Sequence, residues 1–132
     1  LQHEWDQCWK KARAYRQTRF WFPHRNPRQT TNLLKHGRIT LGTFVQFFTG
    51  FNWLSYHQSH VEKCAPPPCS LCGFDREETI HLVTECPALV RLRLDCFGSL
   101  QLPPDWTTAH VHRFITDRRV ADLLRPPDPD GP

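Results

Sequence analysis

The stretch CSLCGFDREETIHLVTEC, residues 69–86, places three cysteines and one histidine in the pattern C-x2-C-x8-H-x4-C. Cys69, Cys72, His81 and Cys86 therefore offer three thiolates and one imidazole, enough for a complete tetrahedral shell around Zn²⁺. A C-x2-C turn aims two sulfur atoms at one point, and His81 and Cys86 can supply the opposite edge. Because protein atoms would fill all four positions, the sequence predicts a structural zinc site rather than a catalytic one.

The other three cysteines are assigned different roles. Cys64 lies five residues before Cys69 and stays open as a spare ligand, although the prolines at 66–68 extend the chain away from a tight site. Cys8 and Cys96 stand alone on apolar-looking faces and are predicted to be small core residues. Since no export signal precedes them, six cysteines favour reduced thiols and a metal, and hence a nuclear or cytoplasmic protein that is not secreted.

The charge of the chain is divided unevenly. Residues 1–38 carry nine Lys or Arg against two acidic residues, a net charge of +7, whereas residues 39–132 carry eight against eleven, a net charge of −3. Such a basic segment is the electrostatic footprint expected for an anionic partner. The arginines predicted to contact RNA or DNA phosphates are Arg13, Arg16, Arg19, Arg25 and Arg28.

Aromatic residues are interleaved with these arginines. Tyr15, Phe20 or Trp21 could stack on unpaired bases, which would favour a single-stranded partner. The alternative is that the aromatic residues belong to the core and that the arginines form a solvated face. For the aromatic residues the core is the better interpretation, and for the arginines both interpretations stay open.

Helical patterns dominate the first sixty residues. Residues 4–19 show helical apolar spacing, which Pro23 brings to an end. Asn26 predicts the N-cap of a helix over 26–34 with proline in its first turn, closed by Gly37. Two further helices are expected, one ending near Gly50 and the next capped by Asn52. Their apolar faces are Leu41, Phe44, Val45 and Phe48, and then Trp53, Leu54, His57 and Val61.

The second half of the sequence contains patterns that predict short helices around the candidate zinc ligands. Asp75 with Glu78 three residues later resembles a capping box, so a helix carrying His81 is expected to begin there. Pro87 would start another helix to about Phe97. The alternation of Leu92, Leu94 and Cys96 would also suit a strand in this segment. Further along, Thr107 is expected to cap the first of a final pair of short helices.

These patterns predict a mostly α fold, a small helical domain with one CCHC zinc knuckle and a disordered C-terminal tail. Four regions are expected: a basic helical region over 1–63, the zinc knuckle and following helix over 64–97, C-terminal helices over 98–124, and the disordered tail 125–132. No apolar run approaches the roughly 18 residues that a membrane span needs. The absence of methionine, including a first methionine, suggests a segment cut from a larger protein.

The sequence contains no pattern that predicts catalysis. No Ser/His/Asp arrangement, glycine-rich phosphate loop or carboxylate cluster for a two-metal centre is present. The histidine pairs at 57 and 60 and at 110 and 112 have no neighbouring cysteines or carboxylates, so surface or core positions are expected for them. An enzymatic function is therefore not expected of this chain, and neither a small-molecule substrate nor a membrane is expected as a partner.

Several short motifs follow one another along residues 5–97. They are Trp5-x3-Trp9; Arg16-Gln17-Thr18-Arg19-x-Trp21-Phe22-Pro23; Leu41-Gly42-x3-Gln46-Phe47-x-Thr49-Gly50; Trp53-Leu54-x2-His57; and Cys69-x2-Cys72-x4-Glu77-Glu78-Thr79-x-His81-Leu82-x2-Glu85-Cys86-Pro87. In this order they resemble the C-terminal segment of non-LTR (jockey-like) retrotransposon polyproteins, downstream of the reverse transcriptase and ribonuclease H domains. The final thirty or so residues carry no part of this resemblance.

The resemblance implies a zinc-bearing tail of an RNA-directed DNA polymerase, which helps to hold template RNA or target DNA during target-primed reverse transcription. It also implies that Cys69, Cys72, His81 and Cys86 are the zinc ligands. Such elements often read Thr-Gly-His where this chain reads Thr49-Gly50-Phe51, which leaves open a decayed copy or a host gene derived from one. The polymerase and nuclease carboxylates would lie outside this segment.

Two functions therefore remain in competition. The favoured one is a nucleic-acid-binding accessory module anchored by the N-terminal arginines. The alternative is a zinc-stabilised protein-interaction or packing module that docks on the rest of the polyprotein, with Phe20-Trp21-Phe22 as an exposed docking surface.

Overall fold

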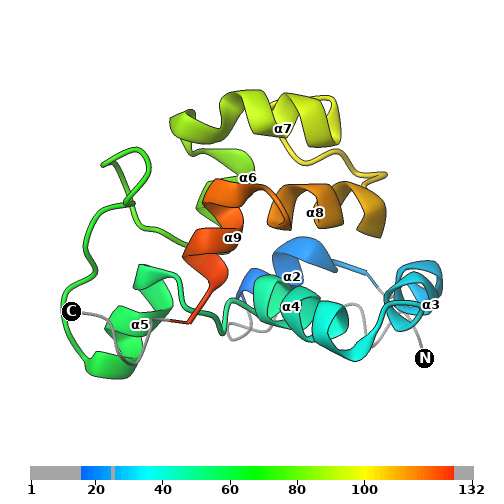
Figure 1. Cartoon of the computed structure of the whole chain (residues 1–132), viewed down its shortest axis with the longest axis horizontal. Helices are drawn as coiled ribbons and strands as arrows, with labels where there is room; N and C mark the ends of the chain where they lie inside the picture. The colour runs from blue at the N-terminus through cyan, green and yellow to red at the C-terminus, as the bar shows by residue number, and fades with distance from the viewer. Residues whose placement is uncertain (1–15, 25, 127–132) are drawn as a thin grey trace. The chain divides into compact units, whose positions relative to one another are not determined.

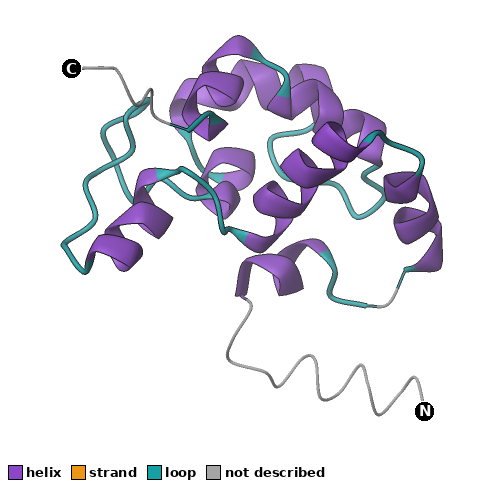
Figure 2. Cartoon of the chain, turned by 60° about the horizontal axis from the view of Figure 1, so that its bottom comes forward, coloured by secondary structure: helices purple, strands orange, loops and turns teal. Residues whose placement is uncertain are grey.

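The computed structural model describes residues 16–24 and 26–126 and is mostly α-helical, as predicted (Figure 1). Helices and loops alone make up the described ranges, apart from one isolated bridge between Pro68 and Arg76 (Figure 2). The chain forms two compact units, Leu1–Gly50 and Phe51–Pro132. The first contains α2 (Arg16–Trp21), α3 (Pro27–Leu34) and α4 (Arg38–Thr49); the second contains α5 (Ser55–Glu62), α6 (Thr79–Thr84), η1 (Pro87–Leu89), α7 (Val90–Phe97), α8 (Thr108–Ile115) and α9 (Arg118–Leu124).

The start of α3 follows the predicted capping chemistry. The side chain of Asn26 accepts a hydrogen bond from the Gln29 backbone N–H at 3.1 Å, and Pro27 occupies the first helical position. Because proline has no N–H to lose, it is well suited to that first turn. α2 ends at Trp21, two residues beyond the predicted end at Arg19 and two residues before Pro23. The remainder of the helix expected over 4–19 lies outside the described residues.

The end of α3 corrects one prediction. Gly37 does not close this helix, because the C-cap is Lys35 and Gly37 is instead the N-cap residue of α4. Its φ of −66° is an ordinary value that requires no glycine. At the other end of α4, Gly50 adopts a φ of +81°, the left-handed conformation that favours glycine in a helix C-cap.

Aromatic rings form the core of the first unit. The Trp21 ring centroid lies 5.6 Å from that of Phe47 and 4.9 Å from that of Phe48. Phe44 and Phe47 are fully buried, whereas Val45 is 50% exposed, so the buried face of α4 includes Phe47 and not the predicted Val45. Trp21 is itself buried, so it belongs to the core as preferred from the sequence and does not contribute to an exposed aromatic run.

In the second unit, the N-cap residue of α5 is Leu54 and not the predicted Asn52, which instead organises the loop before the helix. Its side-chain oxygen accepts the Leu54 N–H at 3.1 Å, and its amide group donates to the Thr79 hydroxyl at 3.3 Å. Leu54 is buried, but Trp53 is 41% exposed and Val61 62% exposed. The apolar face predicted for this helix is therefore buried only at its first turn.

The helix that carries His81 exists but begins later than predicted. α6 starts at Thr79 with Glu78 as its N-cap residue, and no Asp75–Glu78 capping box forms. Asp75 lies in the preceding turn with a φ of +52°, and its carbonyl accepts the Cys69 N–H at 2.9 Å. The backbone of this turn is bonded to the loop before it, so it is not available to start a helix.

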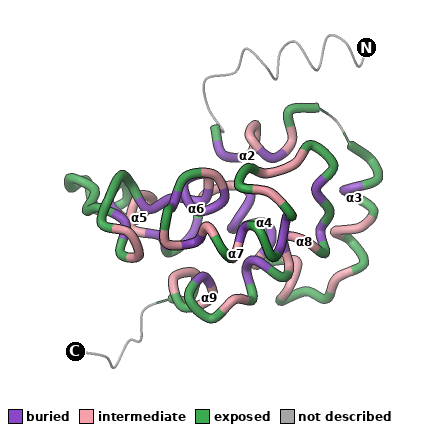
Figure 3. Tube along the Cα trace, turned by 90° about the horizontal axis from the view of Figure 1, so that it is seen from above, coloured by how far each residue is buried: buried purple, intermediate pink, exposed green. Residues whose placement is uncertain are grey.

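Helices α7, α8 and α9 supply the rest of the second core. Proline 87 opens a 3₁₀ turn that continues into α7, so the helix prevails over the strand-like alternation. Thr107 caps α8 in a reciprocal capping box with His110. The Phe97 and Phe114 rings stack with centroids 5.4 Å apart. Buried stretches recur along α6 and α8 (Figure 3). The buried residues of these helices include Leu82, Val83, Val111, Phe114 and Ile115.

The four regions predicted from the sequence have different boundaries from the two compact units, which divide between Gly50 and Phe51. α5 belongs to the unit that begins at Phe51, together with the predicted zinc ligands. The division at 63, 97 and 124 describes sequence character and stays a prediction, and most of the tail expected to be disordered, 127–132, lies outside the described residues. Of the helices in the described ranges, none is long and apolar enough to cross a membrane.

Candidate metal centre

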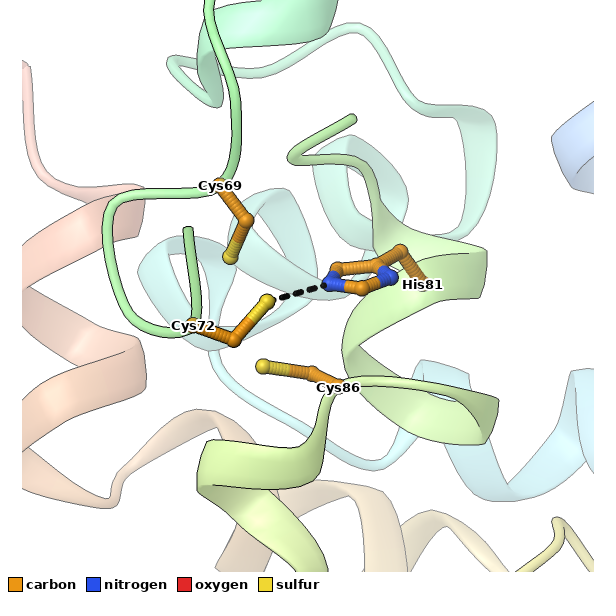
Figure 4. Close-up of side chains that lie close together, drawn as sticks. All are labelled: Cys69, Cys72, His81 and Cys86. Atoms are coloured by element: carbon orange, nitrogen blue, oxygen red, sulfur yellow. Dashed lines mark hydrogen bonds between the residues drawn. The ribbon is translucent and has the colours of Figure 1, made fainter. Parts of the chain in front are cut away.

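Cys69, Cys72, His81 and Cys86 come together in the second unit, and we refer to them as the ligand cluster (Figure 4). One donor atom from each residue lies within 4.8 Å of all the others. Metal–ligand bonds of about 2.0–2.3 Å in a tetrahedron place donor atoms about 3.3–3.8 Å apart. The cluster therefore fits one metal ion after small side-chain adjustments.

The first two ligands are positioned by a tight turn. The Gly73 N–H donates to the Cys69 carbonyl at 2.8 Å, which closes the C-x2-C loop, and Gly73 has a φ of +76°. The Phe74 N–H points to the Cys72 sulfur at a distance of 3.4 Å. The Cys72 sulfur also lies 3.3 Å from the Phe74 carbonyl, so both contacts hold the side chain against the turn.

The other two ligands come from α6 and the residue after its C-cap. His81 lies in the middle of α6, and the Cys86 N–H donates to the His81 carbonyl at 2.8 Å. This bond fixes the backbone of one ligand against that of the next. Cys69, His81 and Cys86 are buried, and Cys72 is half-buried, so the cluster is largely shielded from water.

The two nitrogens of His81 have different surroundings. Nε2 lies 3.4 Å from the Cys72 sulfur and faces the cluster (Figure 4). Nδ1 is buried and makes no hydrogen bond to any residue in the described ranges. A carboxylate lies close to it, since Oε2 of Glu85 is 3.7 Å from Nδ1. Asp75 and Glu85 also lie within 4.8 Å of His81 as a second group of candidate ligands.

This geometry assigns Nε2 as the donor atom of His81. Metal-bound histidines usually donate the other ring N–H to a carboxylate or carbonyl, which fixes the tautomer. Glu85 is placed to accept the Nδ1 proton after a movement of less than 1 Å to a hydrogen-bonding distance of about 3 Å.

Burial dominates the electrostatics of the thiols. It raises the pKa of Cys69 and raises that of Cys86 to about 12. Neighbouring thiols add to both shifts, because two thiolates close together repel each other. Without a metal, Cys69 and Cys86 therefore favour the neutral thiol, and a divalent cation is the partner that would stabilise thiolates at this spacing.

Glu77, for which the sequence predicts no role, is a buried carboxylate that links the loop between Cys69 and Cys72 to α5. Its Oε1 accepts the Ser70 N–H at 3.1 Å and also the Ser70 hydroxyl, and its Oε2 accepts the Ser55 N–H at 3.0 Å. Glu77 is only 4% exposed. The sequence signals for it are its position between Cys72 and His81 and its place in the motif Glu77-Glu78-Thr79-x-His81.

The remaining cysteines lie outside the ligand cluster. Cys64 is exposed, with its sulfur 3.9 Å from a Glu62 carboxylate oxygen, and four ligands are complete without it. Cys96 is buried in α7, as predicted for a core residue, and burial raises its pKa. Cys8 lies outside the described residues.

The predicted phosphate contacts are placed only in part. Arg16 and Arg19 lie on α2 and Arg28 lies on α3, with Arg16 and Arg28 exposed. Arg13 and Arg25 are outside the described residues. Lys35 and Arg38 add two exposed cations at the junction of α3 and α4.

The two histidine pairs join no metal cluster among the described residues. The His57 ring packs edge-on against Phe51, with centroids 4.9 Å apart, and His60 Nδ1 lies 3.0 Å from the Tyr56 carbonyl. His110 serves in the α8 capping box. These are structural positions, as expected.

Comparison of the chain with protein-family models, with curated proteins and with solved structures finds no match. The metal centre is therefore inferred from the geometry of the ligand cluster.

Proposed function

We propose that the chain is a zinc-binding, nucleic-acid-binding accessory module of a non-LTR retrotransposon reverse transcriptase, helping to hold template RNA or target DNA. The observation that carries the proposal is the convergence of the four donor atoms of the ligand cluster within 4.8 Å. In this proposal the chain binds nucleic acid, and the polymerase chemistry belongs to other domains of the parent polyprotein.

The donor set favours zinc over other common ions. Three cysteine sulfurs and one histidine nitrogen suit a borderline-soft cation in tetrahedral geometry, whereas Mg²⁺ and Ca²⁺ prefer oxygen ligands. With four protein ligands no position is left for a substrate or water, so the ion would hold Cys69 and Cys72 of the loop against α6.

Exposed cations support a nucleic-acid partner. Arg16, Arg28, Lys35 and Arg38 are all exposed in the first unit, which has a formal charge of +7 within residues 1–38. Each phosphate contact releases bound counterions and so makes the affinity depend on salt.

The turn that follows Cys72 offers a second type of contact. The Phe74 N–H points at the Cys72 sulfur, so the backbone of Phe74 is held by this turn. Its side chain is 70% exposed, so the ring faces solvent. An exposed ring of this kind can stack on an unpaired base. The Arg76 guanidinium, two residues later, lies 4.7 Å from the centre of the Tyr56 ring, donates to the Tyr56 hydroxyl at 2.7 Å and pairs with Glu78, so a phosphate would have to compete with these contacts.

The test is a binding titration with single- and double-stranded RNA and DNA at several salt concentrations. Single-stranded probes should bind best, and each phosphate contact should contribute about −0.7 to the slope of log K against log salt. Reversing the charge of Arg16 and Arg28 should weaken binding and flatten this slope. A chain that binds none of the probes, or binds with no salt dependence, is not such a module.

A protein-interaction module is the second candidate, and exposed apolar side chains favour it. Leu34 is 68% exposed, Ile39 88% exposed and Val45 50% exposed, all on α3 and α4. If these residues dock on another part of the polyprotein, Ile39→Ser should abolish docking and leave nucleic-acid binding unchanged. Charge reversal at Arg16 and Arg28 should have the opposite effects.

A further inference from the structure

Arg93 is a buried cation beside the ligand cluster. It lies on α7 and is only 3% exposed. Its Nη1 donates to the carbonyl of the metal ligand Cys86 at 2.7 Å and to the Leu82 carbonyl at 3.2 Å. Its Nε donates to the Leu100 carbonyl at 3.0 Å. All three acceptors are neutral backbone groups.

Arg93 has no acidic partner within the described ranges. Arg76, Arg91, Arg119 and Arg125 each pair with a carboxylate, whereas Arg93 makes no such pair with a described residue. Burying an unpaired charge is costly, so buried charges in proteins are normally paired or bound to a metal site. Carbonyl groups reduce this cost but carry no net charge, so a counter-charge is still missing.

The ligand cluster supplies that charge when it holds a divalent ion. Three thiolates carry −3, the ion carries +2 and a neutral imidazole adds nothing, so the loaded centre has a net charge of −1. The guanidinium of Arg93, hydrogen-bonded to the backbone of Cys86, carries +1. The two charges balance, and both are buried in the same unit.

We propose that Arg93 is the counter-cation of an anionic metal–thiolate centre formed by the ligand cluster. The inference rests on the proposed metal site and adds a positioning residue to it. By its hydrogen bonds to Leu82, Cys86 and Leu100, Arg93 also connects the centre to the end of α6 and to the loop after α7. Loading of the metal and packing of α7 are therefore coupled through one side chain.

The experiment measures zinc affinity by competition with a chelator of known affinity, for the wild-type chain and for Arg93→Gln. Glutamine can still donate to a carbonyl but has no charge, so the affinity should fall on the order of 10- to 100-fold. Arg119→Gln is the matched control. Arg119 also donates to a backbone carbonyl, that of Ala88 at 3.1 Å, but it is half exposed and paired with Asp117. Its replacement should leave zinc affinity unchanged.

A second measurement separates charge from packing. Cys72→His would replace a half-buried thiolate by an imidazole and make the loaded centre neutral. In that background Arg93→Gln should lower zinc affinity less than threefold, because no net charge remains to be balanced. A purely structural Arg93 would lose the same factor in both backgrounds, and that result would overturn the inference.

The outcomes remain distinct from those of the proposed function. If the wild-type chain binds no zinc, the metal site itself is wrong. If it binds zinc and Arg93→Gln binds equally well, only the role of Arg93 is wrong. If Arg93→Gln does not fold with saturating zinc, Arg93→Lys decides: zinc binding within about threefold of wild type supports a role of the charge. Failure of the lysine variant to fold or to bind assigns Arg93 to hydrogen bonding alone and rejects the counter-cation.

Discussion

The Nδ1 atom of His81 lies 3.7 Å from Oε2 of Glu85, four residues further along the chain. The same ring turns its Nε2 toward the Cys72 sulfur, 3.4 Å away. One imidazole thus faces three cysteines on one side and a carboxylate on the other. This is the arrangement in which a metal-bound histidine keeps a single tautomer.

Removing that carboxylate should weaken metal binding. We expect Glu85→Ala to lower zinc affinity about tenfold, because the Nδ1 proton would lose its acceptor and the ring its orientation. Glu62→Ala is the control, since its carboxylate lies beside Cys64, outside the ligand cluster. Chelator competition measures both variants, and equal affinities for the two would show that Glu85 does not orient His81.

The pH dependence of zinc binding follows from the raised pKa values of the thiols. Burial raises the pKa of Cys69 above its ordinary value of 9.0 and that of Cys86 to about 12. Both thiols are protonated near neutral pH and must release their protons to a metal. The logarithm of the zinc association constant should therefore rise by about two or more per pH unit between pH 6 and 8. A pH-independent affinity would mean that these two thiols are not ligands.

The metal-free chain should respond to pH in the opposite direction. A thiol whose pKa is higher in the folded state than in the unfolded state binds more protons when folded, and it stabilises the fold below the unfolded value of 9.0. That stability is lost as the pH rises from 9.0 toward about 12, the pKa of folded Cys86. Chemical denaturation with a chelator present should show a free energy of unfolding that decreases over this window. Cys86→Ser should reduce the decrease.

Glu77 should be important for the stability of the second unit. Replacing it by alanine leaves the N–H groups of Ser55 and Ser70 without their buried carboxylate. Hydrogen bonds to charged groups contribute about 1.5–3 kcal/mol each, so we expect a loss of at least 2 kcal/mol. Asp95→Ala is the control, because its ion pair with Arg91 is on the surface and should contribute less than about 1 kcal/mol. Denaturation of both variants with zinc present measures the difference.

The corrected face of α4 gives a test within the first unit. Phe44 is fully buried and its ring centroid lies 5.7 Å from that of Phe48, whereas Val45 is 50% exposed. Phe44→Ala should cost about 3–5 kcal/mol in the free energy of unfolding. Val45→Ala, a change at the neighbouring position, should cost less than about 1 kcal/mol. Comparable losses for the two variants would contradict the observed burial.

The features that the sequence predicted well depend on local chemistry. Asn26 and Thr107 cap helices because their side chains reach N–H groups three residues away, and proline opens α3 and the turn before α7. The C-x2-C loop is equally local. His81 could be assigned to the same site because it lies on a short helix that ends just before Cys86, which keeps the two residues close together.

The features that were missed depend on contacts between distant segments. The capping-box prediction at Asp75 failed because the turn bonds to Cys69, six residues earlier, and Glu77 pairs with Ser55, 22 residues away. Arg93 reaches the carbonyl of Leu82, eleven residues back along the chain. A pattern of neighbouring residues contains no information about such partners, so a buried arginine on α7 resembles an ordinary solvated one.

Metal analysis of the purified chain, combined with X-ray absorption at the zinc edge, tests the central claim most directly. We predict one zinc per chain with three sulfur neighbours at about 2.3 Å and one nitrogen neighbour at about 2.0 Å. In Cys72→Ser one of the three sulfur neighbours should be lost. A wild-type chain without stoichiometric metal, or a zinc ion surrounded mainly by oxygen, would contradict the account.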